Sequence, residues 1–226
     1  EKRSPLYIVG PRGIKRALSA MMVLWEGLPY RLVVIEKPVG SFSINSDVLR
    51  EIEISSLDLD HSTECLGYSL YFKRNREFDP DKALENQVPK HLWRHLQAGQ
   101  TFYMDDVSYT PDMVLGKPRP GIKFSYITDT RPIEAIIPFI KSSRLFVCEA
   151  MYGDDLDIGK AVKNKHMTFR EAANLAYKGQ VDHLLLTHFS PSLDSPGDYI
   201  ENATSVFKNT SLAYDGINIS IGYPDK

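Results

Sequence analysis

The sequence predicts a mixed α/β fold, and two patterns along the chain favour it. Short apolar runs rich in Val, Ile, Tyr and Phe alternate with longer stretches in which apolar residues recur at three- and four-residue spacing. The 226 residues, 42% of them hydrophobic and 25% charged, are enough for one soluble domain with a sizeable core. We therefore expect a single domain over residues 1–226, with an irregular arm or insertion at about residues 74–116.

Local patterns predict the elements of the first half. Gly10 and Pro11 end a short apolar run, and Ile14, Leu18 and Met21 then share one face of a helix. In chain order we expect a strand at residues 6–9, a helix at 14–25, strands at 30–35, 48–59 and 65–72, helices at 80–86 and 90–97, and a strand near 101–107.

From Gly121 onward the alternation of strands and helices is more regular. The helix after Thr168 begins with the pattern of a capping box, because Glu171 follows three positions later. In chain order we expect a strand at residues 123–128, a helix at 132–141, a strand at 145–148, helices at 155–163 and 169–178, a strand at 183–187, a helix at 198–207 and a closing strand at 213–221.

Composition excludes several classes of protein. The net charge of −2 and pI near 6.3 give no global basic field, so any nucleic acid would meet local patches only. No window approaches the roughly 18 to 20 consecutive apolar residues of a membrane-spanning helix, and residues 1–5 do not open a signal peptide. Cys65 and Cys148 lack CxxC spacing, which argues against a disulfide framework or a thiolate zinc site. We expect a cytoplasmic protein with no membrane segment.

Three predicted strands end in a side chain that can bind a metal ion. These side chains are His61, Asp129 and His188. Ligands and catalytic groups commonly lie at strand ends, because the strand is rigid and the loop after it is free of core packing. Taken singly, each residue is more often a surface turn residue or a satisfied buried polar group; the three together are more suggestive of a metal site, although they do not form a strong sequence motif.

Glu149 and His166 form a second candidate pair. Glu149 ends a predicted strand, and His166 stands just before the predicted helix cap. A carboxylate that accepts a hydrogen bond from one imidazole nitrogen fixes the ring's tautomer and suits the ring to proton transfer. The alternatives are a solvated strand end for Glu149 and a residue next to a cap for His166.

The other histidines and the basic clusters carry weaker signals. His91 and His95 have the spacing of helical zinc ligands, but no Glu follows the first, which favours a solvated helix face. His183 heads a strand and is expected at the surface. The clusters at residues 73–76 and 117–119 could contact phosphates, although such runs are more often only solvated.

Taken in order, the motifs resemble those of the ribonuclease Z family, the tRNA 3′-end processing endonucleases of the metallo-β-lactamase superfamily. The matching segments are YIVGPRGI at residues 7–14, DH at 60–61, CLGY at 65–68, TDTRP at 128–132, CEA at 148–150, HMT at 166–168 and LTHFS at 186–190. The resemblance implies a four-layer αββα metallo-β-lactamase-like sandwich with mixed sheets, a precursor tRNA substrate and a homodimer.

The resemblance also implies roles for individual residues. His61 would bind one zinc ion, His188 would bind a second, and Asp129 would bridge the two. The metals would activate a water for attack on the phosphodiester. Glu149 would orient His166, and His166 would protonate the departing 3′-oxygen. Phe189, Ser190 and Arg131 would be supporting or substrate-side residues.

The chain departs from the family pattern at three places. Cys148 stands where the family usually has a His before the Glu. The Gly-Pro element of the tRNA-binding arm is not evident, and residues 88–93 read VPKHLW. The HxHxDH motif is absent from the sequence, so we expect it and the first strands of the fold upstream of Glu1. Without them, each zinc ion has fewer than the three protein ligands usual for catalytic zinc.

The sequence leaves two alternatives to tRNA processing open. The same fold could hydrolyse a smaller phosphodiester, because a fold does not fix a function. The chain could also be a non-catalytic, truncated RNA-binding subunit.

Overall fold

A computed structural model of the chain describes residues 4–23, 27–38, 40–42, 44, 52–104 and 106–223. The chain divides into two compact units. The first consists of Glu1–Phe72 with Ile122–Gly222, and the second consists of Lys73–Gly121 with Tyr223–Lys226. The arm predicted at about residues 74–116 lies within the second unit.

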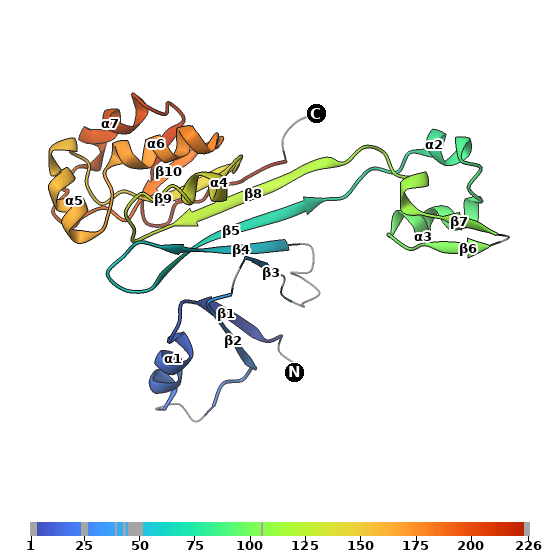
Figure 1. Cartoon of the computed structure of the whole chain (residues 1–226), viewed down its shortest axis with the longest axis horizontal. Helices are drawn as coiled ribbons and strands as arrows, with labels where there is room; N and C mark the ends of the chain where they lie inside the picture. Colours follow the sequence, from blue (N-terminus) through green and yellow to red (C-terminus); the bar gives the residue numbers. More distant parts are fainter. Residues whose placement is uncertain are drawn as a thin grey trace. The chain divides into compact units, whose positions relative to one another are not determined.

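A seven-stranded mixed sheet forms the centre of the first unit, with the strand order β11-β10-β9-β8-β5-β4-β3 (Figure 1). Strands β8 to β11 pair in parallel, whereas β3, β4 and β5 pair antiparallel. The strands are β3 (Ser41–Phe42), β4 (Ile52–Leu59), β5 (Cys65–Arg74), β8 (Arg119–Ile127), β9 (Leu145–Glu149), β10 (Leu184–Thr187) and β11 (Thr210–Leu212). The mixed α/β class is thereby confirmed.

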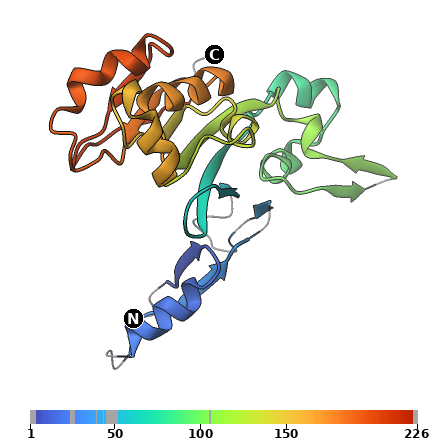
Figure 2. The ribbon, with the colours of Figure 1, turned by 60° about the vertical axis from the view of Figure 1, so that its left-hand side comes forward.

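Helices cover one face of the parallel strands (Figures 1 and 2). The helices of this region are α4 (Ile136–Ile140), α5 (Ile158–Asn164), α6 (Phe169–Gly179) and α7 (Ile200–Thr204). Phe146 and Leu184 of the sheet are fully buried against Phe169 and Ala172 of α6. The sequences of β9 and β10 are apolar at nearly every position, which is typical of strands that are buried on both faces. The predicted capping box at Thr168 and Glu171 is confirmed.

The opposite face of β9 and β10 is covered by the end of the chain. Leu145, Val147 and Leu185 pack there against Ala213 and three isoleucines at positions 217, 219 and 221. The predicted closing strand at residues 213–221 is wrong, because the strand is Thr210–Leu212; the Ala213 N–H still donates to the Leu186 carbonyl at 2.8 Å, but residues 213–221 form no strand. The alternating isoleucines reflect side chains packed on a sheet face, and such packing does not require a hydrogen-bonded ladder.

A separate parallel pair of strands lies near the start of the chain, with β1 (Leu6–Gly10) paired to β2 (Leu32–Glu36). Helix α1 (Ile14–Met22) connects them, as Figure 2 shows. The predicted helix end at Trp25 and the predicted strand start at Val48 lie outside the described residues. The hydroxyl of Tyr68 donates a 2.9 Å hydrogen bond to the Val9 carbonyl, which attaches β1 to β5.

The second unit has a small hydrophobic core of its own. The elements are α2 (Pro80–Glu85), the 3₁₀ turns Lys90–Leu92 and Pro111–Met113, α3 (Trp93–Gln97), β6 (Phe102–Met104) and β7 (Val107–Tyr109). The predicted single strand at 101–107 is instead a hairpin of β6 and β7. Asp106 at its turn has φ 62°, a conformation that Asp tolerates better than most residues. Core contacts join Ala83, Leu96 and Val114.

Four predicted helices are shorter than expected. At residues 90–97 and 155–163 the first turn is 3₁₀, and the α-helices begin only at Trp93 and Ile158. Residues 132–141 contain α4 only from Ile136, and residues 198–207 contain a 3₁₀ turn, Pro196–Tyr199, followed by α7. Among the described residues, no helix has both the length and the apolar character needed to span a membrane.

Candidate metal centre

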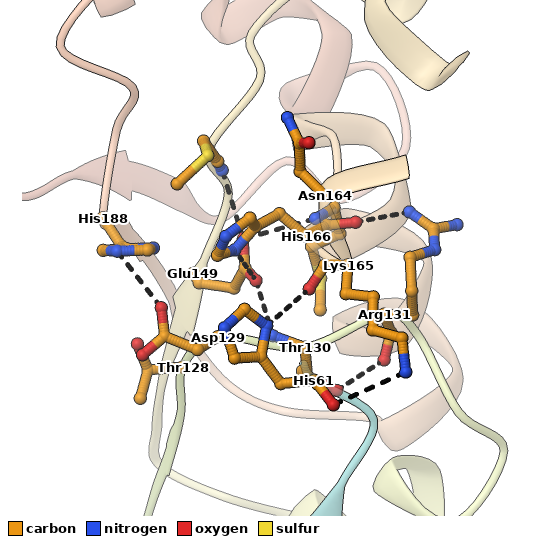
Figure 3. Close-up of polar contacts among 12 residues, drawn as sticks. His61, Thr128, Asp129, Thr130, Arg131, Glu149, Asn164, Lys165, His166 and His188 are labelled. Carbon is orange, nitrogen blue, oxygen red and sulfur yellow. Dashed lines mark hydrogen bonds and ion pairs between the residues drawn. The ribbon is translucent and has the colours of Figure 1, made fainter. Parts of the chain in front are cut away.

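The structure brings all five predicted site residues together at one end of the sheet (Figure 3). Asp129 and His188 follow the ends of β8 and β10, and Glu149 is the last residue of β9. These strands are parallel, so their carboxyl ends lie at the same edge. His61 follows β4, and His166 lies in the connection between α5 and α6.

Glu149 is the buried anchor of the site. Its side chain is fully buried, and Oε1 accepts a 2.7 Å hydrogen bond from the Thr130 backbone N–H. Oε2 accepts weaker bonds, each 3.3 Å long, from the backbone N–H groups of Met151 and Met167. Burial raises the pKa of Glu149 to about 7, and the three backbone donors act in the opposite direction by stabilising the carboxylate.

His166 pairs with this carboxylate. Its Nδ1 lies 2.9 Å from Oε1 of Glu149, and the residue is 7% exposed. Burial lowers the pKa of His166, the charge of His61 lowers it further, and Asp129 acts against both. The arrangement suits proton transfer, because the carboxylate fixes one ring nitrogen and leaves the other for a reacting group.

The three imidazole rings lie side by side. The centroid of the His166 ring is 5.0 Å from that of His61 and 5.2 Å from that of His188. The His188 Nε2 atom lies 3.2 Å from Oδ1 of Asp129. His61 directs its Nδ1 to the Lys165 carbonyl oxygen, at 3.2 Å. That contact fits a proton on Nδ1, which would leave Nε2 as a ligand atom.

Two overlapping groups of side chains have the geometry to hold a metal ion. One is His61, Asp129 and His166, the other is Glu149, His166 and His188, and within each group the ligand atoms lie within 4.8 Å of one another. Imidazole and carboxylate groups are ligands that zinc accepts. The Nδ1 atom of His188 is buried without a hydrogen-bond partner among the described residues, as expected of a donor atom kept for a cation. The residues present therefore fit a divalent metal.

The backbone is strained at three points around the site. Asp129, Lys165 and His188 have φ values of 45°, 59° and 60°, in the left-handed region that costs a residue with a side chain about 1 kcal/mol or more. Such conformations persist where the surrounding contacts impose them, and they concentrate at functional sites. At each of these three residues the left-handed backbone makes a sharp turn after the preceding strand or helix.

Sequence reasoning did not identify the polar network that joins the site loops. Thr130 Oγ1 accepts a 3.0 Å bond from the Asp60 N–H, and the Arg131 N–H donates to the Asp60 carbonyl at 3.0 Å. The Lys165 ammonium lies 2.7 Å from Oδ1 of Asp60. A left-handed Lys at 165 has no sequence signal, because Gly or Asn would be the usual residue there.

The supporting residues named by the family pattern differ in their surroundings. The Phe189 ring packs on Phe169, with ring centroids 5.6 Å apart, at the edge of the core. The Ser190 hydroxyl pairs with that of Ser192 at 2.8 Å. The Arg131 guanidinium pairs with Glu171 at the start of α6.

The weaker candidates lie apart from these groups. His95 belongs to the second unit and pairs with Gln100 at 3.0 Å. His183, expected at the surface, is half-buried and hydrogen-bonded to Ser211 at 2.7 Å. In the part of the chain that the structure describes, neither these residues nor His91 belongs to a group able to hold a metal.

The basic clusters and Cys148 are also partnered. Arg76 pairs with Asp112, and Arg119 pairs with Glu77, so both clusters are partly neutralised within the second unit.

Cys148 is fully buried. Its Sγ lies 3.7 Å from the Met167 sulfur, so this position is part of the core beneath the His166 segment.

Comparison with known proteins gives consistent matches. A relative from Clostridioides difficile named ribonuclease Z is 59% identical over 224 residues, which are 99% of this chain and 73% of that protein. A ribonuclease Z from Clostridium beijerinckii is 46% identical over 98% of this chain and 73% of that protein. No protein-family model matches the chain.

Solved structures show the same fold at low sequence identity. Human tRNase Z, short form, has a TM-score of 0.61 with 18% identity over 98% of this chain and 70% of that chain. A metallo-β-lactamase fold protein from Bacillus subtilis has a TM-score of 0.59 with 16% identity over 96% of this chain and 65% of that chain. The predicted metallo-β-lactamase fold is thus confirmed.

Proposed function

The chain belongs to the ribonuclease Z family, and we propose that it acts as a zinc-dependent endoribonuclease that removes the 3′ trailer from precursor tRNA. The observation that carries this proposal is the Glu149–His166 pair placed directly beside a set of metal-competent side chains. Metal ligands and a separate proton-transfer pair are the two parts that metal-assisted phosphodiester hydrolysis needs.

We propose that His61, Asp129 and His188 hold two zinc ions, with Asp129 shared between them. The support is the 3.2 Å distance from Oδ1 of Asp129 to Nε2 of His188. When bound, zinc supplies an activated water and neutralises charge on the phosphate oxygens. His166 belongs to both candidate metal groups, so its role as a proton donor rather than a ligand rests on its bond to Glu149.

In this proposal, His166 transfers its proton to the 3′-oxygen of the tRNA as the bond between that oxygen and the phosphorus breaks, so that the tRNA keeps a 3′-hydroxyl and the trailer keeps the phosphate. Glu149 holds Nδ1 of the ring, so the remaining nitrogen, Nε2, is the one that donates. The lowered pKa of His166 makes its protonated form a stronger acid. The buried carboxylate stabilises the imidazolium before transfer and keeps the ring oriented after it.

We also propose that the protein works as a cytoplasmic homodimer, as the family resemblance implies. The second unit, with its own core and basic side chains, is the part we expect to contact the tRNA. Light scattering of the purified full-length protein tests the dimer, and a monomer would contradict it.

Cleavage of a precursor tRNA with a 3′ trailer tests the proposed activity. We expect the zinc-loaded full-length gene product to release the trailer and Asp129→Ala to lose at least 100-fold in rate, because the shared ligand is removed. Asp58→Ala is the matched control, since Asp58 is an exposed Asp near the end of β4. Equal cleavage by wild type and Asp129→Ala would sink the proposal. Faster turnover of a chromogenic phosphodiester than of precursor tRNA would favour a small substrate.

A further inference from the structure

The side chain of Arg131 joins the segment that carries Asp129 to the segment that carries His166. Its Nη1 donates to the backbone carbonyl of His166 and, at 2.9 Å, to Oε2 of Glu171. Its Nη2 donates to the other carboxylate oxygen of Glu171. We propose that Arg131 is a positioning residue, which holds His166 in place for proton transfer without touching the substrate. This inference rests on the proposed function.

The geometry favours a structural clamp over a phosphate-binding group. The side chains of Arg131 and Glu171 are only 18% and 22% exposed. Three N–H groups of the guanidinium, two on Nη1 and one on Nη2, donate to protein oxygens, and the pair with Glu171 is bidentate. A guanidinium that is to bind a phosphate needs free donors directed at the substrate. The contacts of Arg131 are therefore those of a group that holds two segments of the protein together.

The partner of this clamp is itself fixed. Glu171 accepts a 3.0 Å bond from the Thr168 N–H and belongs to the capping box of α6. That helix buries six residues, among them Phe169 and Ala172, against the sheet. Arg131 therefore connects His166 to a helix end that the core holds in place. At its own backbone, Arg131 donates a 3.0 Å bond to the carbonyl of Asp60, the neighbour of His61.

The contact acts on the backbone of His166, whereas Glu149 acts on its ring. The His166 N–H donates to the Ala161 carbonyl at 2.9 Å, and the next residue, Met167, donates its N–H to Glu149. The Arg131 guanidinium holds the His166 carbonyl, which lies along the chain between these two N–H groups. Because a catalytic group displaced by about 1 Å can lose about 100-fold in rate, loss of the clamp is expected to affect the chemical step.

Arg131→Lys tests the clamp, because Lys keeps the charge but cannot make the bidentate pair and the carbonyl contact together. The matched control is Arg170→Lys. Arg170 lies on α6 next to Glu171, its side chain is 40% exposed, and its Nε pairs with Oδ2 of Asp155 at 2.6 Å. We expect kcat on precursor tRNA to fall about 10- to 100-fold for Arg131→Lys and less than about 2-fold for the control. KM and bound zinc should stay at their wild-type values.

Two further measurements keep the test decisive. Glu171→Gln should lower kcat similarly, and the double variant should be no slower than either single variant, because one clamp is lost in each case. Amide hydrogen exchange at Met167 should become faster in Arg131→Lys and stay unchanged in Arg170→Lys. Hydrogen exchange is measured without tRNA, so it tests the clamp whether or not the wild type cleaves. A wild type that fails to cleave precursor tRNA would count against the proposed function and not against the clamp.

Three results would overturn the proposal. One is a wild-type kcat in Arg131→Lys. Another is a raised KM with unchanged kcat, which would make Arg131 a substrate-binding residue. The third is unchanged exchange at Met167, which would mean that the guanidinium does not hold the His166 segment.

Discussion

His166 Nδ1 lies 2.9 Å from Oε1 of Glu149, although the two residues are 17 positions apart in the chain. Glu149 ends strand β9, and His166 precedes helix α6 by three residues. The same carboxylate also accepts backbone hydrogen bonds from Thr130 and Met167, which flank Asp129 and His166. Glu149 thus joins three segments of the site.

Glu149→Gln should lower kcat by about 100-fold while leaving the fold intact. The amide has nearly the same shape but no charge to stabilise the imidazolium of His166, and general acid catalysis contributes roughly 100-fold or more. Single-turnover cleavage of precursor tRNA measures the effect. Glu134→Gln, at an exposed position of the same unit, is the control and should cleave at the wild-type rate. A Glu149→Gln variant as fast as the control would remove the proposed role of the carboxylate.

Glu149 should also make stability depend on pH. Burial raises its pKa from 4.5 to about 7, so the folded protein holds this proton where the unfolded chain has released it. The stabilisation from this group is therefore full below pH 4.5 and is lost as the pH rises through about 7. Relative to Glu149→Gln, the free energy of unfolding of the metal-free wild type should fall by about 3 kcal/mol across this range. Urea denaturation measures it, and a constant difference between the two proteins would contradict the assignment.

The zinc content of single-residue variants distinguishes the metal ligands from the proton donor. We expect His188→Ala to lose bound zinc, because His188 carries the buried ring nitrogen without a partner among the described residues. His166→Ala should keep its zinc and lose at least 10-fold in cleavage rate. Elemental analysis of the purified variants gives the zinc content. Loss of zinc from His166→Ala would instead make that residue a ligand, as its membership of both candidate groups allows.

Lys165 should matter through its backbone more than through its charge. Its φ of 59° places its carbonyl against Nδ1 of His61. Lys165→Gly removes a partly exposed ion pair and relieves the left-handed strain, so the free energy of unfolding should change by less than about 1 kcal/mol. Lys165→Val cannot adopt this φ readily, and the displaced carbonyl should weaken zinc binding by about 10- to 100-fold. Zinc titration compares the two variants, and equal affinities would show that the carbonyl does not orient His61.

Two helical glycines should respond to alanine with opposite signs. A Cβ at Gly159 in α5 meets nothing within 4 Å, so Gly159→Ala should raise the free energy of unfolding by about 0.5 to 1 kcal/mol. A Cβ at Gly179 in α6 would lie 2.7 Å from Cγ1 of the buried Ile140. Gly179→Ala should therefore lower the free energy of unfolding by about 1 to 3 kcal/mol. Adding Ile140→Val should recover part of this loss, and stabilisation by both alanines would contradict the packing between α4 and α6.

The strand-end pattern predicted much of the site. Asp129, Glu149 and His188 each follow or end an apolar run, and parallel strands bring such ends to one edge. The capping box at Thr168 was equally visible, because it is a contact between residues three apart. The closing strand at 213–221 failed for the converse reason. An alternating apolar pattern reports which side chains are buried and not which backbone groups pair.

The sequence by itself therefore determined the fold class, the family and the residue types at the strand ends, because these depend on local spacing along the chain. Only the tertiary structure decided that Arg131 reaches the carbonyl of His166, that Lys165 directs its carbonyl at His61, and that His166 borders both groups of candidate ligands. The physical reason is that these contacts join residues 35 to 104 positions apart. Hydrogen bonds between such distant segments are fixed by the packing of the sheet and helices, and they leave no periodic signal in the sequence.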